Sequence, residues 1–178
     1  MHSRLRQHAD GQALVFVALV LAFLIILLLT CIEVGGRSLE LAQIEDALKQ
    51  ATRSSVQTFD YAAFARNGQV LRETSASSTT GCAALDQTSA RSSACAVLLT
   101  NLTGVRGLAE TNPQTAARVW WTFLPQGGAC TFPNGRPPVI FSTSAVCATL
   151  QPRMTGLLGW GIWTPQIDAA DTLDPIDH

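Results

Sequence analysis

Four cysteines lie beyond residue 80, with the spacing of local disulfide bonds: Cys82, Cys95, Cys130 and Cys147. No two of them have the CxxC spacing of a zinc or thiol-redox site. Of the three pairings that four cysteines allow, we favour Cys82 with Cys95 and Cys130 with Cys147, because each closes a local loop. Closing such a loop stabilises a fold by about 3 kcal/mol. Two disulfides would indicate an oxidising compartment; buried free thiols in a cytosolic domain are the alternative.

The residue types that most often carry catalysis do not form a recognisable set. All three histidines lie near the chain ends, at positions 2, 8 and 178, so neither a Ser-His-Asp nor a Cys-His arrangement is indicated. The sequence has no GxGxxG motif and no P-loop. No motif joins the carboxylates of the central part of the chain, which are Asp60, Glu73, Asp86 and Glu110. We expect a protein that is not an enzyme and uses no cofactor.

Acidic residues recur at every third position near the C-terminus, at Asp168, Asp171, Asp174 and Asp177. A calcium-binding EF-hand loop has a different spacing, with an interior glycine and a terminal glutamate. Pro175 also disfavours presentation of these carboxylates on one helix. We therefore expect a solvated acidic tail and no metal site.

The charge balance argues against a polyanionic partner. The 178 residues include 12 Lys and Arg and 13 Asp and Glu, for a net charge of −1. A chain with this balance has no positive field that would hold nucleic acid. We expect no nucleic-acid partner and no small-molecule substrate.

The longest uncharged stretch of the chain indicates a membrane anchor. Ala13 to Ile32 contains no charge, and 15 of its 20 residues are Leu, Ile, Val or Phe. A helix of this length spans about 30 Å, the thickness of the bilayer hydrocarbon, and its composition favours insertion by several kcal/mol. We expect a transmembrane helix at 12–32. The alternatives are a cleaved signal peptide and a lipoprotein signal before Cys31, both of which have shorter apolar regions.

The orientation of this helix is not decided by its flanking charges. Arg4 and Arg6 precede it, and Arg37 and Lys49 follow it. The distal cysteines and the length of the C-terminal part favour a cytoplasmic tail at 1–11 and a head on the other side of the membrane.

Segment 33–66 has the pattern of an amphipathic stalk helix. Glu45 and Lys49 have the i,i+4 spacing of an ion pair, while Gly35 and Gly36 lower the helix propensity by about 1 kcal/mol each and would allow a hinge. Apolar residues recur mainly every three or four positions. They are Leu41, Ile44, Leu48, Ala51 and Phe59. We expect this stripe to pack on the protein's own head; a coiled coil with a partner is the alternative.

Residues 67–178 have the pattern of an α+β head. A Ser- and Thr-rich loop is predicted at 74–93, and a second helix at 94–108. Strands of an antiparallel sheet are predicted at 119–124, 139–141, 146–150 and 160–166. We expect the four tryptophans to form core, with ligand stacking as the alternative. The apolar loop before the last strand predicts an exposed partner patch of Met154, Leu157, Leu158 and Trp160.

Two motifs flanking the apolar stretch resemble those of a known family. Gly11-Gln12-Ala13-Leu14-Val15 and Glu33-Val34-Gly35-Gly36-Arg37 are similar to the N-terminal region of the TadE/TadG-like proteins of tight-adherence (Flp) pilus assembly. Segment 146–163 is more loosely similar to ectodomains of that family. The resemblance implies a pilin-like fold, a single pass through the bacterial inner (cytoplasmic) membrane with a periplasmic or extracellular head, and other pilus-assembly or pilin subunits as partners.

The resemblance also implies roles for individual residues. Gly11 and Gln12 flank a candidate processing site, Glu33 begins the motif after the span, and Phe16, Ala18 and Ala22 are positions of helix packing in the membrane. TadE-type members have a glutamate in place of Phe16 and a proline in place of Ala22. The chain is therefore more similar to the TadG-like branch.

We expect a membrane-anchored minor pilin-like or accessory structural subunit of a tight-adherence, type IV-related pilus system. It would act through helix packing in the bilayer and contacts of its head. The alternative is a single-span extracytoplasmic sensor or ligand-binding protein. Two questions stay open from the sequence: whether residues 1–11 are cleaved, and whether the subunit enters the filament.

Overall fold

The computed structural model describes residues 3–58, 60–66, 71–72, 76–82, 89–133, 135–156, 159 and 161–173, with side chains from residue 14 onward except those of 63 and 64. The helices are α1 (Ser3–Val56), α2 (Tyr61–Phe64), α3 (Ala90–Leu102) and α4 (Asn112–Ala116). The strands are β1 (Ser77–Thr80), β2 (Trp120–Leu124), β3 (Gly128–Cys130), β4 (Val139–Phe141), β5 (Ala145–Leu150), β6 (Met154–Thr155), β7 (Ile162–Trp163) and β8 (Ile167–Thr172). The α+β layout predicted from the sequence is confirmed, with a long apolar N-terminal helix and a small head.

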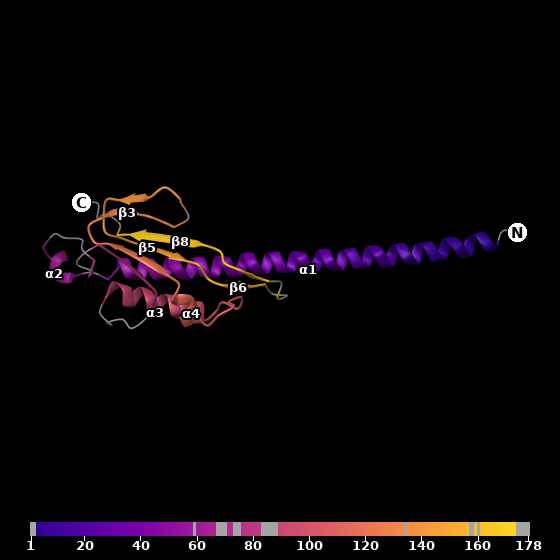
Figure 1. Cartoon of the computed structure of the whole chain (residues 1–178), viewed down its shortest axis with the longest axis horizontal. Coiled ribbons are helices and arrows are strands. Elements are labelled where there is room, and N and C mark those ends of the chain that lie inside the picture. The colour runs from indigo at the N-terminus through magenta and orange to yellow at the C-terminus, as the bar shows by residue number, and fades with distance from the viewer. Residues whose placement is uncertain are drawn as a thin grey trace.

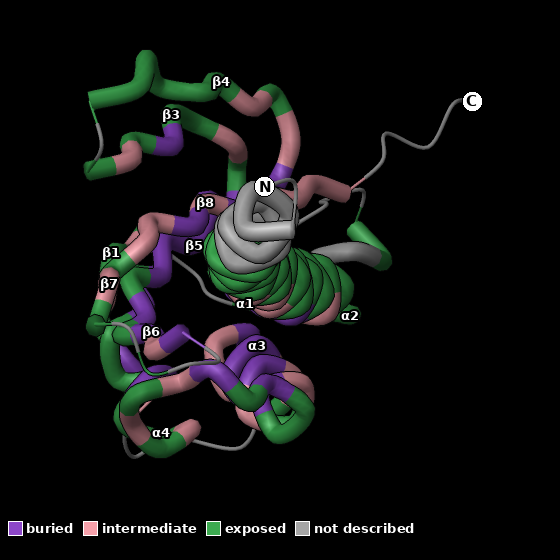
Figure 2. Tube along the Cα trace, turned by 90° about the vertical axis from the view of Figure 1, so that its right-hand side faces the viewer, coloured by how far each residue is buried: buried purple, intermediate pink, exposed green. Residues whose placement is uncertain are grey.

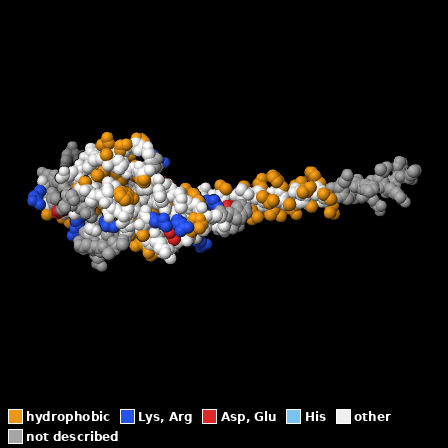
Figure 3. Space-filling model, viewed as in Figure 1, with side chains coloured by type: hydrophobic (Ala, Val, Ile, Leu, Met, Phe, Trp, Pro, Cys, Tyr) orange, Lys and Arg blue, Asp and Glu red, His pale blue; other side chains and the backbone are white. Residues whose placement is uncertain are grey.

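Helix α1 is a single rod of 54 residues whose N-terminal half projects from the head (Figure 1). It continues through Gly35 and Gly36 without a break. Arg37 donates a hydrogen bond of 2.7 Å from Nε to Glu33 Oε1 across the two glycines and so supports the helix there. Apolar side chains cover the described part of the projecting half, and charged side chains reappear where α1 meets the head (Figure 3). In length and composition this helix can cross a membrane.

The helix ends earlier than the predicted stalk boundary at residue 66. It stops at Val56, and a new short helix begins at Tyr61. Asp60 accounts for the new start, since its Oδ1 accepts a hydrogen bond of 2.9 Å from the backbone N–H of Ala62. A short acidic side chain in this position competes with continuation of a helix and favours a new N-terminus.

The head is built on a four-stranded antiparallel sheet with the order β1-β2-β5-β8. Two smaller antiparallel pairs accompany it, β3 with β4 and β6 with β7. Looking along α1, Figure 2 shows the buried segments of β5, β8 and α3 gathered around the C-terminal part of α1. The end of the long helix therefore forms the centre of the head.

The apolar stripe of α1 supplies much of the core. Ile44 and Leu48 are fully buried, and they share one cluster with Leu98 of α3 and Trp121 of β2. The prediction that the stripe packs on the protein's own head is confirmed for its described residues, and Phe59 lies outside them.

The prediction that the tryptophans form core is confirmed for Trp121, whose ring centroid lies 6.3 Å from that of Phe123. It is wrong for Trp120, which is 45% exposed, and Trp160 lies outside the described residues.

A second layer covers part of the opposite face of the sheet. Side chains alternate along β2 and β5, so that Phe123 and Val146 face α1 while Leu124 and Cys147 face away. The β3–β4 hairpin lies over the outward-facing residues and is joined to β5 by the Cys130–Cys147 disulfide. This small cluster comprises Leu124, Cys130, Ala145 and Cys147, with Phe132 and Phe141 packed against it.

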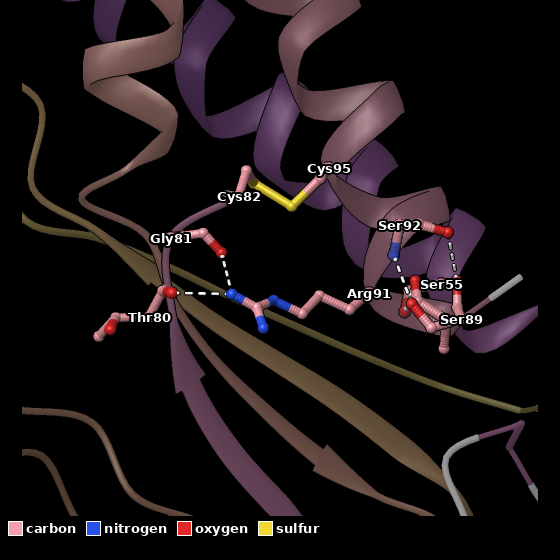
Figure 4. The surroundings of a disulfide bond; sticks show 9 residues. Ser55, Thr80, Gly81, Cys82, Ser89, Arg91, Ser92 and Cys95 are labelled. Atoms are coloured by element: carbon pink, nitrogen blue, oxygen red, sulfur yellow. Dashed lines mark hydrogen bonds between the residues drawn. A yellow bond between two sulfur atoms is a disulfide. The ribbon is translucent and has the colours of Figure 1, made fainter. Parts of the chain in front are cut away.

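The predicted loop at 74–93 is wrong in part, because it contains the edge strand β1 and the start of α3. Ser89 begins α3, accepting a hydrogen bond of 3.1 Å at Oγ from the backbone N–H of Ser92. Arg91 then donates from Nη2 to the carbonyls of Thr80 and Gly81, at 2.9 and 2.8 Å (Figure 4). These bonds, beside the Cys82–Cys95 disulfide, hold the end of β1 against α3.

The prediction of a solvated acidic tail is also wrong for the residues that the structure describes. β8 pairs with β5 from Ile167 opposite Leu150 to Thr172 opposite Ala145. Asp168 accepts a hydrogen bond of 2.9 Å from Thr149 Oγ1. The strand forms because Ile167 and Ala169 alternate with polar residues and enter the core. Asp174 and Asp177 lie outside the described residues.

Candidate interaction site at the helix–head junction

Glu33 is the first charged residue after the apolar stretch, and the head buries it. Its exposed fraction is 3%, and the ion pair with Arg37 joins Oε1 to Nε at 2.7 Å. Gly156, which follows β6, lies so close that a side chain there would overlap the Glu33 carboxylate. Because an unpaired buried carboxylate costs several kcal/mol, the Arg37 partner is needed for this packing.

Arg37 also contacts the head through an aromatic ring. Its guanidinium carbon lies 5.8 Å from the ring centroid of Trp163 in β7, a distance that allows cation–π attraction. The same guanidinium group lies beside Gly156. One arginine thus joins the carboxylate of Glu33 to the β6–β7 hairpin.

Glu40 makes a similar contact two turns further along α1. It accepts a hydrogen bond from the backbone N–H of Gly107, and a side chain on Gly107 would overlap its carboxylate. Partial burial raises the pKa of Glu40 above its ordinary value of 4.5, and the negative charge of Glu33 raises it further. The charge of Arg106 and the Gly107 hydrogen bond oppose this rise.

These contacts place three charged side chains on one face of α1, directly beyond the apolar stretch. Residues 33, 37 and 40 are spaced three and four apart, so they share a face of the helix. Each carboxylate lies in the space left by a glycine of the head, Glu40 beside Gly107 and Glu33 beside Gly156. The arrangement fixes the axial position and rotation of α1 relative to the head.

The two glycines of the motif predicted after the span, Gly35 and Gly36, are less buried than Glu33. Gly35 faces open space, since a Cβ atom at this position would have no neighbouring atom within 4 Å. Gly36 is half-buried. The sequence motif therefore contributes Glu33 and Arg37 to the junction, and sequence reasoning missed Glu40, Gly107 and Gly156. The i,i+7 spacing of Glu33 and Glu40 was the one local signal for this set.

The predicted exposed patch is wrong at Met154. This side chain has an exposed fraction of 0% and belongs to the main core. Met154 is held inside because it pairs with Trp163 of β7 on one side and forms a β-bridge with Leu108 on the other. Leu157, Leu158 and Trp160 lie outside the described residues.

The structure joins Cys82 to Cys95 and Cys130 to Cys147, with Cα atoms 5.6 and 6.3 Å apart. These are the two local pairs favoured from the sequence. Cys31 is a free cysteine exposed on α1. Among the described residues, no group of three or more His, Cys, Asp or Glu side chains is arranged to hold a metal ion.

The residues predicted for packing in the membrane lie on the projecting part of α1. Phe16, Ala18 and Ala22 are exposed there. Gly11 and Gln12 fall within the same helix, and their side chains are not described.

No protein-family model, curated protein or solved structure matches this chain. The contacts of the junction are those of a joint between helix and head.

Proposed function

We propose that the chain is a membrane-anchored structural subunit of a tight-adherence pilus system, of the TadE/TadG-like type. The observation that carries this proposal is the division of α1 into two parts. Its first part is apolar and exposed, whereas its second part is the central helix of the head. A rod of this kind transmits the position of the head to whatever holds the apolar part.

The exposed apolar part of α1 is best suited to a lipid environment. Residues such as Phe16, Leu24 and Leu28 are more than half exposed in the chain alone. Leu, Ile, Phe and Val each favour insertion by about 0.3–0.6 kcal/mol at a helix centre. We infer that this part spans the bacterial inner membrane once, with the two disulfides of the head on the oxidising side.

Helix packing in the bilayer would provide the link to other subunits. Association of helices in lipid depends on close approach of backbones at small residues rather than on the hydrophobic effect. Ala18 and Ala22 are spaced by four, so they lie on one face of α1 and match a small-xxx-small pattern. The pilin-like character is supported by a long helix packed on an antiparallel sheet, and the protein would serve as a minor pilin-like or accessory component.

Photo-crosslinking in native cells tests this proposal. A photoreactive residue at Ala22 is expected to crosslink to another pilus-assembly subunit, and deletion of the gene is expected to reduce surface pili. The matched control carries the same residue at Tyr61, which is exposed on the head away from the apolar part of α1. Normal piliation after deletion, together with no crosslink from Ala22, would contradict the proposal.

Membrane insertion has its own test. Leu24→Arg places a charge within the apolar part of α1. It should make the apparent free energy of membrane insertion less favourable by about 2.5–3.5 kcal/mol in a translocation assay. Leu39→Arg makes the same change at an exposed position beyond the apolar part, and insertion should be unaffected. Equal insertion of both variants would count against a membrane span.

A further inference from the structure

A cleft of about 450 Å³ opens on the sheet face that points away from α1. This volume is within the range of about 300–1,000 Å³ typical of small-molecule sites. Its lining residues come from β1, from β2 and β5 with the residues beside them, and from the segment after β3. They are Thr80, Arg118, Trp120, Thr131, Phe132, Pro133, Thr149 and Gln151.

The floor of the cleft is a row of neighbours that crosses the sheet. Thr80 pairs with Trp120, Trp120 pairs with Thr149, and Thr149 pairs with Asp168. Trp120 is 45% exposed, whereas its neighbour Trp121 is fully buried on the other face. A large indole face is therefore presented to solvent between two hydroxyl side chains.

The wall of the cleft is held in place before any ligand arrives. Phe132 and Pro133 follow β3, and Phe132 packs on the small cluster beneath the hairpin. The Cys130–Cys147 disulfide joins that hairpin to the sheet. A wall fixed in this way lowers the ordering cost of binding.

The charges around the cleft are compensated within the chain. Arg118 pairs with Glu110 at 2.8 Å, and Arg136 lies 3.8 Å from Asp168. Asp168 also accepts hydrogen bonds from Thr149 and from Gln166, at 2.9 and 3.0 Å. The two arginines and the two carboxylates balance, so the cleft has no net charge to attract an anion or a cation and favours a neutral ligand with many hydrogen-bonding groups.

We propose that this cleft binds a neutral saccharide. The apolar C–H face of a sugar ring would stack on the Trp120 indole, and its hydroxyls would meet Thr80, Gln151 and the remaining N–H donors of Arg118. A proline-rich peptide would use the aromatic surface but not the polar floor. The site lies on the other side of the sheet from α1, so it is independent of the proposed role of that helix.

The test uses the full chain in lauryldimethylamine oxide micelles, because a detergent with a sugar head group would compete. Cellobiose, maltose and N,N′-diacetylchitobiose are titrated separately while the side-chain amide signals of Gln151 are followed by NMR. At least one of them is expected to give a saturable shift. Trp120→Ala should weaken binding about tenfold or more, Trp120→Phe should retain most of it, and Tyr61→Ala, an exposed aromatic away from the cleft, should leave it unchanged.

Three results would overturn the proposal. One is the absence of a saturable shift with all three sugars; another is binding that Trp120→Ala leaves unchanged. The third is stronger binding of sodium sulfate or of a proline-rich peptide in the same titration, which would assign the cleft to another ligand. Far-UV circular dichroism of each variant establishes that the head remains folded, and Trp120→Phe provides a second measurement if Trp120→Ala is unstable.

Discussion

The carboxylate of Glu33 occupies the space that a side chain on Gly156 would need. Gly156 does not have a positive φ, so the glycine is required here by space and not by backbone conformation. Gly107 has the same relationship to Glu40. The charged residues that follow the apolar stretch are thus fitted to glycines that come much later in the chain.

Substitution at Gly156 tests this packing. Gly156→Ala should displace the Glu33 carboxylate from its site beside Arg37, lowering the free energy of unfolding by about 1–3 kcal/mol. Gly104→Ala is the matched control, because the nearest atom to its new methyl group is 4.0 Å away. Denaturant unfolding in micelles, followed by tryptophan fluorescence, measures both. Equal stabilities of the two variants would show that the contact contributes little.

The raised pKa of Glu40 predicts a particular dependence on pH. A carboxyl whose pKa is higher in the folded state stabilises the fold fully below the unfolded value, here 4.5, and this contribution is lost as pH rises through the folded pKa. Glu40→Gln keeps an oxygen for the Gly107 N–H and removes the charge. The melting temperature of this variant relative to the native chain should therefore rise between pH 4.5 and neutral pH.

The control for this effect removes the same charge elsewhere on α1. Glu45 forms an exposed ion pair with Lys49 at 2.7 Å, and Glu45→Gln should lower stability at neutral pH by no more than about 0.5 kcal/mol. The two substitutions are thus expected to have opposite signs at neutral pH. Destabilisation by Glu40→Gln at neutral pH would show that its charge, and not its hydrogen bond alone, supports the junction.

The disulfides predict both a thiol count and a loss of stability. Protein isolated from native cells should show one reactive thiol, Cys31, and five after reduction and denaturation. Replacing Cys130 and Cys147 together by alanine opens a loop with a sequence separation of 17 and should cost about 3 kcal/mol. Cys31→Ala is the control and should leave the unfolding of the head unchanged. More than one reactive thiol in the native protein would indicate a reducing compartment.

The long helix and its buried stripe were predictable from the sequence because their signals are local. Ile44, Leu48 and Ala51 recur at helical spacing over several turns, and the uncharged stretch before them is unambiguous. The disulfide pairs follow from the same local reasoning. Signals of this kind depend on neighbours within a few residues, so one sequence is sufficient.

The edge strand β1, the junction and the cleft depend on contacts between segments that are distant in the sequence, and these contacts have no local signal. β1 consists of Ser and Thr alone, and a polar edge strand has no apolar alternation of its own to reveal it. Glu40 meets Gly107, and Glu33 meets Gly156, only once the head has folded around α1. The cleft was missed for the same reason, since its floor is a row of residues on separate strands, among them Thr80, Trp120 and Thr149.

β8 shows why a local pattern can mislead and how its packing can be checked. Its aspartates, at intervals of three, indicate a solvated tail, but Ile167 and Ala169 are only 5% and 4% exposed. Ile167→Ala should therefore lower the free energy of unfolding by about 2–5 kcal/mol, as expected for a buried residue reduced to alanine. Ala170→Ser, on the exposed side of the same strand, should change it by less than about 0.5 kcal/mol. If residues 167–172 were a solvated tail, neither substitution would change the stability. An unchanged free energy of unfolding for Ile167→Ala would therefore show that β8 does not pack in the core.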